Sequence, residues 1–203
     1  MARLGRIDVE IICCIIILSC FCVGDAVAQP KSGQVPRDIQ STYEPRSDPA
    51  TGQRFLAKFV GDWDIDKTFY PRSGEPARTK GECHQTMIHG GRFLKSEFLF
   101  ERDGSSSTGT GIVGFEAESG KFTSVWIDSR RTAMSMRQSR DRFDGNEIVL
   151  YSTSLGKNGG GRVSRTVTRL EDDGRKIVHK QYATGPDGRD RLVMELVMSR
   201  KLH

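Results

Sequence analysis

The sequence predicts an all-β fold, an up-and-down barrel of about ten antiparallel strands preceded by one short helix. Two observations predict it. From Asp62 onward, apolar and polar residues alternate with a period of two, which is typical of half-buried strands. Turn signals such as Ser119-Gly120 and Asp173-Gly174 separate most segments by about 13 to 16 residues, without room for a helical crossover. Such a meander closes most economically into a barrel, because closure removes exposed strand edges.

The elements follow in order along the chain. Asp48 is expected to cap the helix, with Pro49 at its first position, and Gly61 to end it. Apolar residues between positions 55 and 60 recur on one helical face. The expected strands cover residues 62–69, 79–88, 92–101, 108–116, 121–128, 132–140, 146–154, 162–170, 175–183 and 190–200.

Residues 1–28 have the features of a secretory signal peptide. Arg3 and Arg6 precede an apolar run over residues 11–23, and Ala26-Val27-Ala28 offers the small-x-small pattern of a cleavage site. The run is shorter than the roughly 20 residues that a membrane span needs. We therefore expect cleavage and export to the periplasm or the cell exterior, with no stable membrane span left. An uncleaved anchor is the alternative.

Two further regions complete the domain organisation. Residues 29–47 contain three prolines among polar residues and are expected to form a flexible linker, whereas residues 48–203 form one barrel domain. The mature chain keeps a single cysteine, Cys83, so no internal disulfide can form and the core must hold the fold.

Charge does not point to a nucleic-acid partner. Loss of residues 1–28 removes two basic and three acidic residues, which leaves a net charge of about +6. The most basic stretch, residues 130–142, is interrupted by aspartates and lacks interleaved aromatic residues. We expect no nucleic-acid binding, and the sequence indicates no oligomeric state.

No motif amounts to a catalytic or metal site. Residues 109–114 match the dinucleotide-binding pattern, but no helix can follow them, so glycines in a closely packed strand explain the run better. The aspartates in residues 62–66 lack the glycine and glutamate of a calcium loop. Cys83 and His84 are strand neighbours that point to opposite faces, and His89 lies too far along the strand for a dyad. The sequence therefore leans against an enzyme and identifies no cofactor.

A ligand pocket is the functional alternative to a filled core. Trp63 lies on the apolar face of the first strand, and Trp126 shares its face with Asp128, a serine and another aromatic residue. Mixed aromatic and polar faces are typical of pocket walls. We therefore expect Trp63, Phe115 and Trp126 to line a cavity, with Asp128 or Arg92 as its polar anchor.

Several motifs, taken together over residues 48–202, resemble the domain-of-unknown-function family 1579. They are Phe55-Leu56 with Val60-Gly61-Asp62-Trp63, the segment Met87 to Leu94, Gly111 to Phe115, Phe122 to Ser129, and Met194-Glu195-Leu196 with Ser199-Arg200.

The resemblance implies a lipocalin-like (calycin) barrel without an agreed activity. The Gly61-Asp62-Trp63 start is also similar to that of fatty-acid-binding barrels and of haem barrels such as nitrobindin, which implies His179 as the stand-in for the iron ligand. We expect a small apolar ligand in the barrel cavity. The alternatives are a haem or metal barrel, a hydrolase or isomerase built in the cavity, and a structural or interaction module without a ligand.

Overall fold

The computed structural model describes residues 48–102, 104–155, 161–185 and 187–202. The signal peptide and linker predicted for residues 1–28 and 29–47 lie outside the described residues. Within the described ranges, no helix has the length and apolar character needed to cross a membrane.

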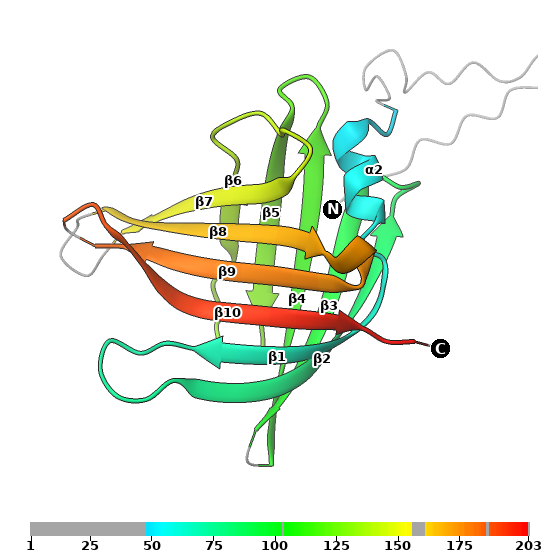
Figure 1. Cartoon of the computed structure of the whole chain (residues 1–203). Coiled ribbons are helices and arrows are strands. Elements are labelled where there is room, and N and C mark those ends of the chain that lie inside the picture. The colour runs from blue at the N-terminus through cyan, green and yellow to red at the C-terminus, as the bar shows by residue number, and fades with distance from the viewer. Residues whose placement is uncertain (1–47, 103, 156–160, 186, 203) are drawn as a thin grey trace, which may run out of the picture. The chain divides into compact units, whose positions relative to one another are not determined.

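In the described part of the chain, ten strands form one closed antiparallel barrel, as predicted, with one short α-helix and one 3-10 turn (Figure 1). Each strand pairs with its neighbours in sequence, and β1 pairs with β10 to close the barrel. The bounds are α2 Thr51–Ala57, β1 Gly61–Phe69, β2 Ala77–Ile88, β3 Phe93–Arg102, β4 Ser105–Glu116, β5 Lys121–Asp128, β6 Ser135–Gln138, β7 Glu147–Leu155, β8 Gly161–Glu171, η1 Asp172–Gly174, β9 Lys176–Thr184 and β10 Asp190–Arg200.

The alternation in β1 shows how the sequence selects the barrel's inner face. Trp63 and Ile65 are buried, whereas Asp64 and Asp66 between and after them are exposed. Trp63 lies opposite Arg200 of β10 and opposite Cys83 of β2. The apolar side chains of β1 therefore point into the barrel, and the aspartates point into solvent.

The helix begins later than the sequence predicts. Asp48 and Pro49 precede it, Ala50 is the N-cap, and the first helical residue is Thr51. The side chain of Gln53 explains the shift, because its Oε1 accepts a hydrogen bond from the backbone N–H of Ala50 at 2.8 Å. An amide three residues into the helix thus supplies the cap that the sequence analysis had assigned to Asp48.

Strand β6 is shorter than predicted. The expected strand covers residues 132–140, but only 135–138 pair with β5, and a single pair, Gln138 with Tyr151, joins β6 to β7. At Ser139 the backbone N–H still donates to the carbonyl oxygen of Phe122 at 2.8 Å, but the N–H of Phe122 donates to the Ser139 hydroxyl, which itself donates to the carbonyl oxygen of Val149 at 2.9 Å. A side-chain hydrogen bond thus takes the place of one ladder bond where the strand ends.

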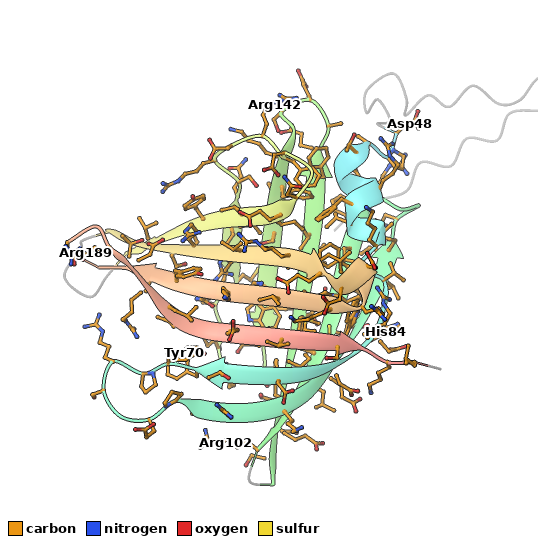
Figure 2. All side chains as sticks on the ribbon, in the orientation of Figure 1. Asp48, Tyr70, His84, Arg102, Arg142 and Arg189 are labelled. Atoms are coloured by element: carbon orange, nitrogen blue, oxygen red, sulfur yellow. The ribbon has the colours of Figure 1, made fainter. Side chains whose placement is uncertain are left out.

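Helix α2 covers one end of the barrel and closes a dense core there (Figure 1). Gln53 fixes the helix to β4, since its Nε2 donates to the carbonyl oxygen of Phe115 at 2.7 Å. The side chains with almost no exposed surface lie in this core: Leu56, Phe59, Trp63, Phe122, Ile177 and Met198. We call this end the helix end, and the opposite end, whose loops carry Tyr70, Arg102 and Arg189, the open end (Figure 2).

Candidate functional site

The inner face of the barrel changes character between its two ends. At the helix end the inward side chains are buried, but toward the open end they keep exposed surface although they point into the barrel. The partly exposed inward residues are Ser124, Trp126, Arg137, Ser152, Ser164, Thr168, His179, Gln181 and Met194. These inward residues are partly exposed, and we call the inner face that they form the lumen.

One wall of the lumen is aromatic. Trp126 lies across the backbone of β4, where a Cβ at Gly109 would be 2.4 Å from its ring and a Cβ at Gly111 would be 3.4 Å away. Phe98 meets Trp126 edge to face, with ring centroids 5.3 Å apart, and Phe100 stacks beside Phe98. The two glycines of the dinucleotide-like run therefore make room for an indole, in agreement with the closely packed strand that the sequence predicts.

Polar groups hold Trp126 in place at the open end. Its indole Nε1 donates to Asp128 Oδ2 at 2.9 Å, and Asp128 Oδ1 accepts from the backbone N–H of Arg130. The indole hydrogen bond is the main reason why the pKa of Asp128 lies below its usual value. Lys67 reaches the same region with its ammonium 4.4 Å from the centroid of the Phe100 ring, and burial lowers its pKa.

The opposite wall, formed by β7, β8 and β9, is polar. The hydroxyls of Ser152 and Ser164 are 2.8 Å apart, and Thr168 Oγ1 lies 2.8 Å from His179 Nδ1. Burial, together with the nearby positive charge of Arg137, lowers the pKa of His179 to about 4. The imidazole is therefore neutral at pH 7.

Arg137 lies on the inner face of β6, opposite Ser124 of β5. Its Nε is buried without a hydrogen-bond partner, and no carboxylate of the described residues forms an ion pair with its guanidinium. Burial lowers the pKa of this group, but an arginine side chain remains charged in a protein. The lumen thus contains a positive charge without a counter-ion from the described part of the chain.

The structure brings together only two of the five candidate residues named from the sequence, Trp126 and Asp128. Trp63 has no exposed surface, and its Nε1 donates to the carbonyl oxygen of Phe59 at the helix end. Phe115 packs there against other aromatic rings, and Arg92 lies in the turn after β2, where its Nη1 contacts two backbone carbonyls.

Sequence reasoning missed the role of Arg137 and gave His179 only through a resemblance. Arg137 alternates with exposed Met136 and Gln138, so period two could have placed it inside, but it lies within a basic stretch of the kind that is usually solvated. His179 alternates in the same way with buried Ile177. In both cases the informative feature is that the residue stands at an inward-facing position of its strand, and its charge is not informative.

The remaining sequence motifs lie outside the lumen or inside the core. Cys83 is buried, and burial raises the pKa of its thiol, whereas His84 points outward and its Nδ1 lies 2.7 Å from Asp62 Oδ1 (Figure 2). Their predicted divergence is confirmed. Among the residues that the structure describes, no three His, Cys, Asp or Glu side chains come together as a metal site.

Two hollows on the surface differ from the lumen in their lining. One, of about 400 Å³, lies at the tip of the β3–β4 hairpin, and the other, of about 280 Å³, lies between the start of α2 and the loop that contains Phe143. Neither is lined by Trp126, Arg137 or His179. The first is lined by charged and small loop residues, and the second by Phe115 and Phe143 together with Arg142 and Asp144. The second hollow thus includes one residue, Phe115, that the sequence predicts to line a cavity. Because both hollows lie at loops, we take the lumen as the candidate site.

Comparisons with known proteins agree with this architecture. Residues 48–200 match the model of the family described as "Protein of unknown function (DUF1579)", and the chain belongs to that family. The structure is similar to the crystal structure of Rv2717c from M. tuberculosis, with a TM-score of 0.56 and 15% sequence identity over 76% of this chain and 100% of that chain. A second similar structure is the S-type phycobiliprotein lyase CPES from Guillardia theta, with a TM-score of 0.51 and 10% identity over 76% of this chain and 94% of that chain. Comparison with curated protein sequences gave no match.

Proposed function

We propose that this member of the DUF1579 family binds a small, largely apolar molecule in the lumen of its barrel. The observation that carries the proposal is Trp126, an aromatic side chain that points into the barrel and still keeps exposed surface. A solvent-reached aromatic surface inside a barrel is typical of a ligand pocket, because burying it against a ligand is favourable.

The wall around Trp126 supports the same proposal. Phe98 and Phe100 extend the apolar surface along β3, and Asp128 fixes the indole through its Nε1. A ring held by both packing and a hydrogen bond loses little freedom on binding, so more of the contact energy appears as affinity. The similar structures support the fold alone, and the ligand is inferred from these residues.

The chain's two tryptophans allow a direct test. In Trp63→Phe the tryptophan emission comes from Trp126 alone, and in Trp126→Phe it comes from Trp63 alone. A brominated alkane, which quenches on contact, should reduce the emission of Trp126 and leave that of Trp63 unchanged. Equal quenching in the two variants, or none in either, would contradict the proposal.

Affinity gives the second measurement. Trp126→Ala should weaken binding of the neutral probe N-phenyl-1-naphthylamine by about 2 kcal/mol, as loss of a central aromatic anchor does. Its effect on the free energy of unfolding should be smaller, because the side chain is partly exposed. A large loss of stability with unchanged probe affinity would assign Trp126 to the core.

A haem barrel is the alternative that one observation favours. His179 faces the lumen with a neutral imidazole, the form that can coordinate iron. Bound haem would supply an iron centre for redox or gas-binding chemistry. Addition of haemin should then produce a Soret band that His179→Ala removes. A Soret band of equal strength in the variant, or none in the parent chain, would exclude His179 as the ligand.

We also propose that the chain is exported and cleaved between Ala28 and Gln29, on the basis of the Ala26-x-Ala28 pattern after a short apolar run. Intact-mass measurement of the protein recovered from the cell envelope should give a chain that begins at Gln29. A chain that retains Met1 would show an uncleaved anchor instead.

A further inference from the structure

We infer that the lumen binds an amphipathic organic monoanion, such as a long-chain carboxylate, with Arg137 pairing with its charged group and the aromatic wall covering its apolar tail. This inference rests on the proposed function and adds the charge of the ligand to it. It is carried by the position and the missing partner of one guanidinium.

Arg137 occupies a position where a charge is costly. It points inward from β6, and its Nε has neither solvent nor a hydrogen-bond acceptor. A buried donor without a partner destabilises a fold, and charged groups inside proteins are normally paired. A side chain of this kind is retained most readily where a ligand completes its hydrogen bonds.

Other arginines of the same barrel have the partners that Arg137 lacks. The guanidinium of Arg200 donates to three backbone carbonyls. Arg165 is paired with Asp190 at 2.8 Å, and Arg169 with Glu147. Among the described residues, Arg137 has no such acceptor, although its position in the lumen is less solvated than that of Arg169.

The groups around Arg137 are neutral, which sets the charge of the ligand. Ser124 lies opposite it, and His179, whose pKa is lowered by burial and by the charge of Arg137, is uncharged at pH 7. The other lumenal cation, Lys67, lies near the open end, where Asp128 partly offsets its charge. One guanidinium balances one negative charge, so a monoanion fits better than a phosphate dianion. A carboxylate can also accept two parallel hydrogen bonds from the planar guanidinium.

The neighbouring wall provides the surface for the tail. In the β5–β6 ladder Arg137 pairs with Ser124, and Trp126 pairs with Ser135, so Arg137 and Trp126 lie on the same inner face, two positions apart. Phe98 continues this surface from Trp126. A ligand with a charged group at Arg137 can therefore place carbon atoms against the aromatic wall, and such a molecule satisfies both surfaces at once.

The test compares two probes that differ in charge, decanoate and decan-1-ol, with the full chain at pH 7. Decanoate should bind roughly 10- to 100-fold more tightly than the alcohol, as expected for a charge-assisted hydrogen bond. Arg137→Gln should abolish this preference and leave the affinity for decan-1-ol unchanged. The control is Arg140→Gln, which removes the same charge from the outside, where Arg140 stacks on Tyr151, and should retain the preference.

The possible outcomes distinguish a failure of the anion site at Arg137 from a failure of ligand binding in the lumen. A preference for decanoate that survives in Arg137→Gln would overturn the anion site, and so would a preference for the alcohol in the parent chain; in both cases lumenal binding stands. If neither decanoate, decan-1-ol nor the neutral naphthylamine probe binds, the lumenal function itself fails. Circular dichroism and thermal unfolding should show that Arg137→Gln folds at least as well as the parent, because it removes an unpaired charge.

Discussion

The two ends of the barrel each hold one tryptophan and one arginine on the inner face, and they use these residues in opposite ways. At the helix end Trp63 is fully buried, and the guanidinium of Arg200 lies 4.2 Å from its ring. At the open end Trp126 keeps exposed surface, and the Nε of Arg137 has no hydrogen-bond partner among the described residues.

The difference shows that the alternation of inward and outward residues along a strand does not by itself distinguish core residues from residues of the candidate site. Trp63 and Trp126 obey the same alternation, but α2 and its aromatic cluster cover the first and no element of the described chain covers the second. A polar group whose hydrogen bonds are all made stabilises the fold when it lies beside a buried ring. A polar group without a hydrogen-bond partner beside a partly exposed ring favours the binding of a ligand. The helix end therefore accounts for stability, and the open end is where the proposed ligand would bind.

The largest expected effect separates the two tryptophans. Trp63→Ala should lower the free energy of unfolding by about 4 kcal/mol, because it leaves a large cavity and an unpaired carbonyl at Phe59. Trp126→Ala should cost clearly less, since this residue is partly exposed. Urea unfolding of both variants measures the difference. Equal losses would mean that the open end is packed as tightly as the helix end.

The second effect depends on pH and concerns His179. Its pKa falls from 6.5 in the unfolded chain to about 4 in the fold, so between these values the unfolded chain binds the proton first. Stability should therefore be complete above pH 6.5 and fall by up to about 3 kcal/mol as the pH is lowered toward 4.

Carboxylates contribute to stability over part of the same range, so the matched comparison is with His179→Gln. The difference between the unfolding free energies of the parent and the variant should change between pH 7 and pH 4.5. A constant difference would show that the imidazole is not desolvated in the fold.

The third effect contrasts the two arginines. Arg200→Met should destabilise the fold by about 2 kcal/mol, because its guanidinium donates to the carbonyls of Gly174, Val60 and Lys58. Arg137→Met should leave the melting temperature unchanged or raise it, since the Nε of Arg137 has no acceptor among the described residues. A marked loss in Arg137→Met would reveal a partner for that side chain within the protein.

The smallest effect tests the wall under Trp126. Gly109→Ala places a Cβ 2.4 Å from the indole and should cost about 1 kcal/mol while displacing the ring and weakening probe binding. Gly111→Ala places its Cβ at an ordinary contact distance of 3.4 Å and should be tolerated. Indistinguishable probe affinities in these two variants would show that the position of the indole does not matter for binding.

The fold could be predicted almost completely from the sequence. Alternation and turn signals predict all ten strands, with the clearest error at β6, where the N–H of Phe122 donates to the Ser139 hydroxyl rather than to a backbone carbonyl and the strand ends. The cap of α2 was also misplaced, since the Gln53 side chain does what Asp48 was expected to do. Both errors come from single side-chain hydrogen bonds, which periodicity cannot reveal.

The site could be predicted only in part. Trp126 and Asp128 are two positions apart in one strand and so point to the same face, which means that their contact could be predicted from the sequence. Trp63 could be placed inside but not at a particular depth, because depth depends on where α2 closes the barrel. Arg137 could not be recognised as unpaired, since pairing depends on side chains brought together from different strands.

The way in which the barrel closes also determines the order in which its strands can pair during synthesis on the ribosome. Nearly every strand pairs with the strand made just before it, so the sheet can grow hairpin by hairpin as the chain emerges. The exception is β10, which pairs with β1, the first strand made. The last residue of β10 is Arg200, which packs against Trp63. A nascent or truncated chain that lacks β10 would expose one side of β1 and one side of β9, and it should self-associate until the final strand arrives.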